Sequence, residues 1–147
     1  MTAKRILIIC LFISMLFCLP SKAQKPGDIV SEQTIRKLGE KHFFSISPIP
    51  EDIFRLMQGK TYKKNCTIAR SELRYLRCLH MDKDGRKIVG EMVVNKTIAT
   101  DVLDIFRKLY EAKYPIERMR LIDYWDADDE RAMRANNSSS FNFRFIS

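Results

Sequence analysis

The centre of the chain alternates between hydrophobic patterns typical of strands and of helices. Apolar and polar side chains roughly alternate from Glu72 to Met81, which predicts a strand partly buried on both faces. The turn sequence Asp82-Lys83-Asp84-Gly85 follows, with the Asp-Gly pair that favours hairpins. Residues 87–94 are the predicted returning strand, so this region is expected to form a β-hairpin.

Three stretches have helical patterns. Residues 98–113 form the clearest one, and their apolar positions at helical spacing are Ile98, Val102, Ile105, Phe106 and Leu109. Tyr114-Pro115 predicts the end of this helix. A short helix is expected to follow Pro50 and to continue through Met57, because proline and acids suit a first turn. A charged helix is expected over residues 126–135, with Asp126 as its N-cap.

The remaining segments have weaker patterns. Residues 24–33 are polar and predict a flexible leader, and residues 34–44 predict either a short helix or an extended arm. Pro48 and Pro50 predict a break over residues 45–50. Residues 116–122 are a third strand candidate. The order helix, hairpin, helix, strand, helix predicts an α+β fold, with a small sheet, a hairpin and packed helices.

The N-terminus has the order of a secretory signal. Lys4 and Arg5 precede an uncharged apolar run, and Ser21-Lys22-Ala23 places small residues before a cleavage site. The run is shorter than the ~20 residues of a spanning helix, so no stable membrane span is expected after cleavage. We therefore predict a signal peptide over residues 1–23, a leader or linker over 24–44, a domain over 45–147, and export to the periplasm or the medium. A retained N-terminal anchor is the alternative.

Length and charge limit the function classes. The 147 residues suit one domain, and the formal net charge of +8 falls to +5 when Lys4, Arg5 and Lys22 leave with the signal. A modest positive charge favours anionic surfaces such as cell-wall polymers or lipid headgroups, or it reflects only a basic solvated surface. Basic and acidic residues are interleaved and no nucleic-acid motif is present, so no nucleic-acid partner is expected.

Cysteine and histidine offer little chemistry. Cys66 and Cys78 remain after signal removal and permit one disulfide in an exported chain, while two buried thiols are the alternative. The two histidines, His42 and His80, lack the spacing of a zinc motif. A composite zinc site from His80, Cys66 and an aspartate is one hypothesis. The favoured alternative is that His42 and His80 are ordinary histidines, either exposed or hydrogen-bonded within the protein.

Acidic residues gather in two places. Residues 82–86 superficially resemble a calcium loop, but they lack its third acid and its final glutamate, so a hairpin turn explains them better. The second group could bind a cation or hold a general base, although acids at a helix N-terminus are the simpler account. Its members are Asp123, Asp126, Asp128, Asp129 and Glu130.

Several segments together carry a resemblance to a known family. They are Gly59-Lys60-Thr61-Tyr62 with Cys66, Leu73-Arg74-Tyr75-Leu76, Gly85, Gly90-Glu91-Met92-Val93-Val94-Asn95, Ile98-Ala99, Val102-Leu103, Ile105-Phe106, Leu109-Tyr110, Tyr114-Pro115-Ile116-Glu117 with Met119, Asp123-Tyr124, and Asn136-Asn137-Ser138-Ser139-Ser140-Phe141-Asn142-Phe143-Arg144. The chain resembles the D-alanyl-D-alanine carboxypeptidase and L-alanyl-D-glutamate endopeptidase family of zinc peptidases (VanY-like). The resemblance covers residues 54–144, and the last segment is its most specific part.

The resemblance implies a zinc hydrolase whose metal activates a water for attack on a peptide bond involving a D-amino acid. In that family the zinc ligands lie in a Ser-x-His-x-x-Gly-x-Ala-x-Asp motif that follows the arginine, with a later histidine and a glutamate as general base. None of these follows Arg144 in this sequence. We therefore expect the N-terminal part of an exported peptidoglycan peptidase, an incomplete domain that is inactive by itself. No catalytic residue, metal ligand or cofactor is assigned to this chain, and zinc is expected for the intact family member.

The resemblance also implies a substrate rim. Arg144 would face the cleft and hold the substrate or the developing oxyanion, and Asn142 and Ser139 would shape the same rim. The alternative for Arg144 is a structural pair with an acid. Peptides of peptidoglycan are the expected partners. The alternative function is a non-catalytic cell-wall-binding or exported interaction protein.

Overall fold

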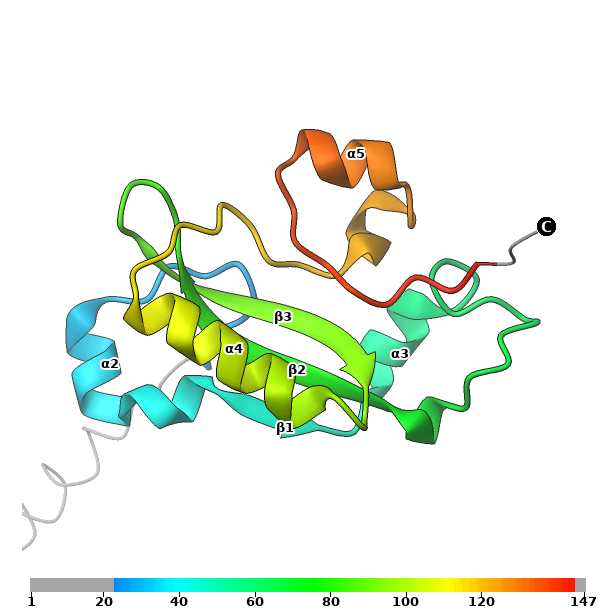
Figure 1. Ribbon diagram of the computed structural model, residues 1–147, viewed down its shortest axis with the longest axis horizontal. Helices are drawn as coiled ribbons and strands as arrows, with labels where there is room; N and C mark the ends of the chain where they lie inside the picture. The colour runs from blue at the N-terminus through cyan, green and yellow to red at the C-terminus, as the bar shows by residue number, and fades with distance from the viewer. Residues whose placement is uncertain (1–22, 145–147) are drawn as a thin grey trace, which may run out of the picture.

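A three-stranded antiparallel sheet forms the centre of the molecule (Figure 1). The computed structural model describes residues 23–144, so the predicted signal peptide lies outside the described residues except for Ala23. The strands are β1 (Ser45–Ser47), β2 (Leu73–Met81) and β3 (Lys87–Asn95), in the order β1-β2-β3. The predicted α+β fold is confirmed.

The predicted hairpin is confirmed by β2 and β3, which pair from Leu73 opposite Asn95 to Met81 opposite Lys87. The turn between them is organised by the side chain of Asp82. Its Oδ1 accepts hydrogen bonds from the backbone N–H groups of Asp84 (3.0 Å) and Arg86 (2.8 Å). Gly85 adopts a φ of +77°, which glycine tolerates best. The hairpin turn, rather than a calcium loop, therefore explains the acidic residues at positions 82–86.

Strand β1 was not expected, because residues 45–50 were predicted to be a break. That prediction is wrong for Ser45–Ser47, which pairs antiparallel with β2 from Ser45 opposite Arg77 to Ser47 opposite Tyr75. The physical reason lies in Pro48, since the residue before a proline favours extended backbone. A proline is also tolerated beside an edge strand, where no ladder hydrogen bond is lost.

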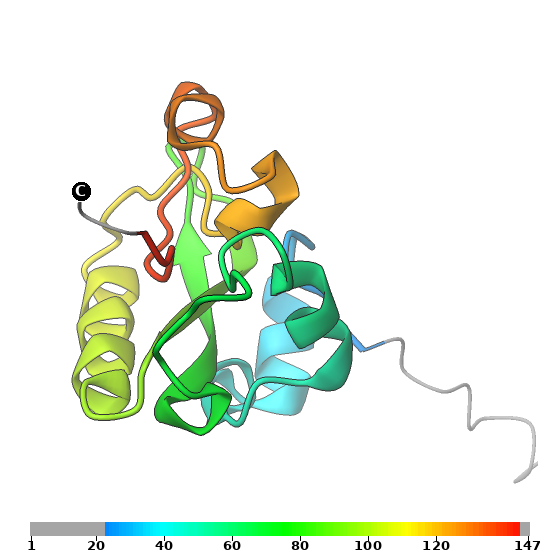
Figure 2. The same cartoon turned by 90° about the vertical axis from the view of Figure 1, so that its right-hand side faces the viewer.

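The helices cover both faces of the sheet. Helix α4 (Ala99–Glu111) lies on one side and α3 (Glu51–Met57) on the other (Figure 2). Both match the predictions to within two residues. Two predicted core positions of α4 are wrong, because Ile98 is 47% and Ile105 is 54% exposed. No helix within residues 23–144 is long and apolar enough to cross a membrane.

Residues 24–44 pack onto the sheet, so the flexible leader that polarity predicts for residues 24–33 is wrong. A short helix was one of the two expectations for residues 34–44, and α2 (Glu32–Leu38), followed by the 3₁₀ helix η1 (Glu40–Phe43), agrees with it. Before α2, the backbone N–H groups of Gly27 and Val30 donate to the carbonyls of Val89 (2.7 Å) and Lys87 (2.8 Å), which covers part of the outer edge of β3. Four side chains of this region join the core cluster on the α4 side. They are Val30, Ile35, Phe43 and Phe44.

Residues 116–122 are not the predicted third strand. Arg118 forms an isolated bridge with Asn137, and the preceding residue Pro115 forms one with Met81. The 3₁₀ helix η3 (Ile122–Trp125) then begins. Helix α5 (Asp129–Arg134) starts three residues later than predicted. Its N-cap is Asp128 rather than Asp126, because Asp126 has a φ of +57° and an N-cap residue needs extended backbone.

Both cysteines of the described region are free thiols, so the structure shows no disulfide between Cys66 and Cys78. Cys78 is 2% exposed and contacts Met119, and burial raises the pKa of its thiol to about 12. We predict that a thiol reagent modifies Cys66 in the native protein and leaves Cys78 unmodified until denaturant is added. Mass-spectrometric mapping of the labelled cysteines checks this. Equal native labelling, or the recovery of a Cys66–Cys78 disulfide, would contradict it.

Candidate functional site

The predicted rim residues lie in the last described segment, residues 138–144. Its backbone is fixed at three points, because the N–H groups of Ser138, Phe141 and Phe143 donate to the carbonyls of Arg118 (2.9 Å), Val93 (3.2 Å) and Thr61 (3.2 Å). In Figure 1 this segment, in red, runs past the end of β3 towards α3. The rim is therefore anchored to the sheet and to the loop after α3.

Two of the three predicted rim residues meet at Asp129, at the start of α5. The guanidinium of Arg144 forms an ion pair with the Asp129 carboxylate, and this pair lowers the pKa of Asp129. The amide of Asn142 lies 3.4 Å from Asp129 Oδ1 and 3.3 Å from the Ala127 carbonyl oxygen. Ser139 takes no part in this contact. The ion pair with Asp129 is the structural role that was the alternative for Arg144. Its side chain remains 52% exposed, and a substrate role for it stays a prediction.

Within residues 23–144, no three His, Cys, Asp or Glu side chains gather closely enough to hold a metal ion. The composite site suggested for His80 and Cys66 therefore does not form. His80 Nδ1 contacts the Ile116 carbonyl (2.8 Å), and Cys66 contacts the Ile68 carbonyl (3.7 Å). The described residues do not fit the zinc centre that the family resemblance implies, and no catalytic step is assigned to them.

The acidic group around η3 and α5 is engaged in structural contacts. Asp126 pairs with Lys60 (2.9 Å) and Arg131 (3.2 Å), which lowers the pKa of the Asp126 carboxyl. Asp128 accepts from the Arg131 backbone N–H as the N-cap of α5 (3.1 Å). Ion pairing therefore accounts for Asp126, and the predicted role at a helix start is found for Asp128.

Asp123 is the buried member of that group, at 2% exposure. Its Oδ1 accepts from the hydroxyl (2.6 Å) and the backbone N–H (3.2 Å) of Thr61, which is itself fully buried. Burial nevertheless raises the pKa of Asp123 above its ordinary value, because removing the carboxylate from water outweighs the two hydrogen bonds and nearby Lys60. The contact ties the loop after α3 to η3.

The raised pKa of Asp123 predicts a pH-dependent effect of Asp123→Asn. A carboxyl with a raised pKa contributes stability in acid, and this contribution is lost as the pH rises through the folded-state pKa. Asparagine does not ionise, and its Oδ1 can accept the same two hydrogen bonds. We therefore expect the free energy of unfolding of Asp123→Asn, relative to wild type, to increase from acidic to neutral pH in denaturant titrations.

The control is Asp104→Asn, which removes a carboxylate from the exposed face of α4. A stability difference that stays constant or falls with pH for Asp123→Asn would contradict the prediction.

A buried charged cluster, not singled out as a site by the sequence, lies in the middle of β3. Glu91 is fully buried, and its two carboxylate oxygens accept from the hydroxyl of Tyr75 (2.6 Å) and from Nε of Arg120 (2.7 Å). The Arg120 guanidinium lies 4.3 Å from the ring centroid of Tyr124. Burial and the charge of Glu91 raise the pKa of Tyr75. The sequence signal is a glutamate among the apolar residues of a strand, although nothing local indicates its partners.

Arg120 and Tyr124 line two clefts. One, named here the hairpin cleft, includes residues near the turn between β2 and β3 and has a volume of about 500 Å³. The other, named the N-terminal cleft, includes residues 23–26 and has a volume of about 600 Å³. The lining of the N-terminal cleft includes Gln24, Tyr75, Arg77 and Glu91. The hairpin cleft is lined by Gly27, Ile29, His80, Asp82, Arg86, Ile88, Glu117, Arg118, Met119 and Trp125, besides the two shared residues.

His80 gives the hairpin cleft a neutral hydrogen-bond acceptor. The side chain is 2% exposed, and Nδ1 must carry the hydrogen because the Ile116 carbonyl can only accept. Desolvation lowers the pKa of His80, which favours the neutral ring. Nε2 is then an acceptor, and it has no hydrogen-bond partner among residues 23–144.

Comparison with known proteins identifies no relative, since the chain matches no protein-family model, no curated protein and no solved structure.

Proposed function

We propose that this chain is the N-terminal, peptide-binding part of an exported peptidoglycan peptidase of the VanY-like class. One observation carries the proposal, namely the meeting of Asn142 and Arg144 at Asp129 within the segment that most resembles that family. The segment is tied to β3, and the guanidinium that it presents is still half exposed.

The chemistry of Arg144 suits an anionic peptide group. A guanidinium has five N–H donors in a planar fork, and one carboxylate partner leaves some of them available. The pair with Asp129 restricts the rotamers of Arg144 before any ligand arrives, which lowers the entropy cost of binding. A peptide carboxylate or carbonyl at this rim would then receive charge-assisted hydrogen bonds.

Binding to cell-wall material tests the proposal. The purified chain is expected to sediment with isolated peptidoglycan, and calorimetry with a soluble stem peptide is expected to show its affinity fall about tenfold in Arg144→Met, as for the loss of a charged hydrogen bond. Arg134→Met is the matched control, because Arg134 lies on α5 with its side chain 72% exposed. Equal affinities of wild type and Arg144→Met for the stem peptide would show that Arg144 does not contribute to binding.

Hydrolysis is a separate readout of the same sample. With zinc added to this chain, we expect no release of D-alanine from muropeptides, because no three His, Cys, Asp or Glu side chains among residues 23–144 gather closely enough to hold a metal ion. Zinc-dependent release by this chain would contradict the expected inactivity. Translation of the DNA beyond codon 147 in all three frames would show whether a zinc motif is encoded there.

The alternative function, a non-catalytic wall-binding protein, is favoured by the packing of the rim segment. Phe141 packs against the core cluster on the α3 side, next to Tyr62 at a ring-centroid distance of 6.4 Å. If the chain is a wall-binding protein, it is expected to unfold cooperatively and to bind little hydrophobic dye. It is also expected to sediment with peptidoglycan. Extensive dye binding by the native chain would argue against this alternative, because it indicates an exposed apolar face.

A further inference from the structure

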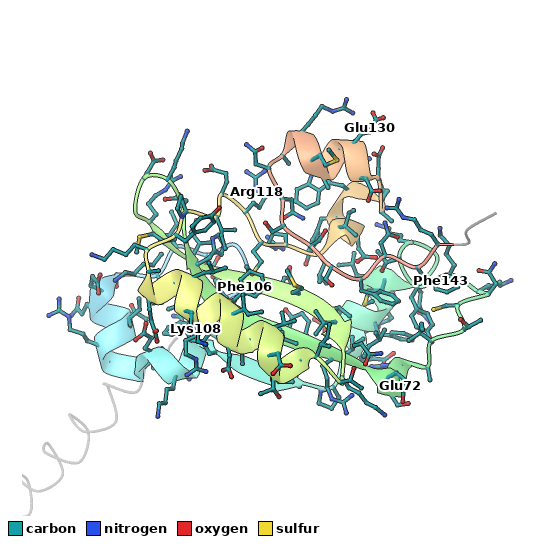
Figure 3. All side chains as sticks on the ribbon, viewed as in Figure 1. Glu72, Phe106, Lys108, Arg118, Glu130 and Phe143 are labelled. Atoms are coloured by element: carbon teal, nitrogen blue, oxygen red, sulfur yellow. The ribbon has the colours of Figure 1, made fainter. Side chains whose placement is uncertain are left out.

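The lining of the hairpin cleft includes an acid, Glu117, and a base, Arg118. Among residues 23–144, no cation lies within ion-pair distance of Glu117, and no acid lies within that distance of Arg118. Arg118 does donate from Nη1 to the Ala135 carbonyl (2.9 Å), which anchors it beside α5. Figure 3 shows Arg118 on the segment that connects α4 to η3.

The other charges of this cleft are already neutralised within the protein. Arg86 pairs with Asp82 (2.6 Å) and Asp84 (3.4 Å). Arg120 pairs with Glu91 (2.7 Å). Glu117 and Arg118 are therefore the charged groups of the lining that remain available to a ligand, and they are opposite in sign.

His80 adds a second acceptor to the lining that also contains Glu117. Burial lowers the pKa of His80, and the negative charges of Asp82 and, to a smaller extent, Glu117 oppose this lowering. Neutral Nε2 and a carboxylate are both acceptors. Together they suit a ligand group with several N–H donors and a positive charge, as in an ammonium group.

Apolar and aromatic side chains complete the lining. Ile29 and Ile88 contribute aliphatic surface, and Tyr124 and Trp125 contribute aromatic rings. The volume of about 500 Å³ falls within the usual size of small-molecule sites. The cleft thus combines an acceptor pair, a cation and an apolar wall.

We propose that the hairpin cleft binds a small α-amino acid as its zwitterion. The ammonium group lies against Glu117 and His80 Nε2, the carboxylate lies against Arg118, and the ligand side chain contacts the apolar wall. This site shares no residue with the Arg144 rim, so it does not rest on the proposed function.

Other ligand classes fit the cleft less well. A simple anion would meet the negative charge of Glu117 beside Arg118. A divalent cation would find two donors, His80 and Glu117, because the oxygens of Asp82 are held by Arg86 and the hairpin turn. Among residues 23–144, the absence of any group of three such side chains agrees with this.

Calorimetry and NMR titration of the folded chain with L-alanine and L-phenylalanine test the proposal. Dissociation constants on the order of 1 mM are expected for such small ligands. Blocking the ammonium as the N-acetyl derivative, or the carboxylate as the amide, is expected to weaken binding at least about tenfold in each case. Each derivative removes one charge and leaves the ligand side chain unchanged.

Two variants assign the two ends of the ligand. Within residues 23–144, Glu117→Gln breaks no side-chain hydrogen bond, and it is expected to abolish the preference for free over N-acetylated ligand. Arg118→Gln keeps an N–H donor for the Ala135 carbonyl, and it is expected to abolish the preference for the free acid over the amide. Glu130→Gln and Arg134→Met are the matched controls on α5, with exposed side chains (83% and 72%), and both are expected to bind like wild type.

The proposal is overturned by no detectable binding of the free amino acids, by equal binding of free and blocked ligands, or by unchanged preferences in both cleft variants. Failure here is distinguishable from failure of the proposed function. Glu117→Gln is expected to leave sedimentation with peptidoglycan unchanged, and Arg144→Met is expected to leave amino acid binding unchanged.

Discussion

Arg120→Met is expected to lower the free energy of unfolding by about 3–5 kcal/mol, the range for breaking a buried ion pair by removing one partner. Glu91 is fully buried in β3, and Arg120 supplies the cation beside its Oε1. Methionine has a similar length but no charge, so Tyr75 alone would remain to solvate the carboxylate. Denaturant unfolding at neutral pH measures the loss.

A second substitution separates this cause from simple loss of packing. The double variant Glu91→Met/Arg120→Met is expected to be more stable than the sum of the single losses predicts, since it leaves no buried ion without a partner. A loss below about 1 kcal/mol in Arg120→Met, typical of an exposed pair, would show that the cluster is solvated.

Phe43→Ala is expected to destabilise the protein by about 3–5 kcal/mol, as is usual for removing a buried phenylalanine. Phe43 is 1% exposed and belongs to the core cluster on the α4 side, together with Leu79 and Val89. Alanine would leave a cavity between η1 and the sheet. The effect would be absent if residues 24–44 were a leader outside the folded unit.

The control for Phe43→Ala is Ile29→Ala, which truncates an apolar side chain of the same N-terminal region. Ile29 is 61% exposed, so its loss is expected to stay within about 0.5 kcal/mol. Similar small losses in both variants, by chemical denaturation, would show that residues 24–44 do not contribute to the stability of the domain.

Elements with a long periodic pattern or a specific turn were predictable from the sequence. Helix α4 and the β2–β3 hairpin were expected because each has a pattern over nine or more residues. Strand β1 has only three residues, and residues 116–122 form single bridges rather than a ladder. Segments this short carry too little periodicity to show which partners they find.

The candidate sites were predictable only in part. The sequence singled out Arg144, Asn142 and Ser139 through a family resemblance, and the structure brings the first two together at Asp129 but not the third. The Glu91–Arg120 pair joins residues 29 positions apart, and no spacing rule connects them. The hairpin cleft likewise combines Gly27 and Ile29, the hairpin, residues 117–120 and η3.

The sequence by itself determined the α+β class, the central hairpin and the two helices that cover the sheet, because these depend on local periodicity and turn chemistry. Tertiary structure alone decided that residues 24–44 enter the core, that Glu91 is neutralised by Arg120, and that Glu117 and Arg118 share a cleft with His80. The physical reason is that burial and charge pairing depend on which distant segments meet, and a single sequence does not specify those meetings locally.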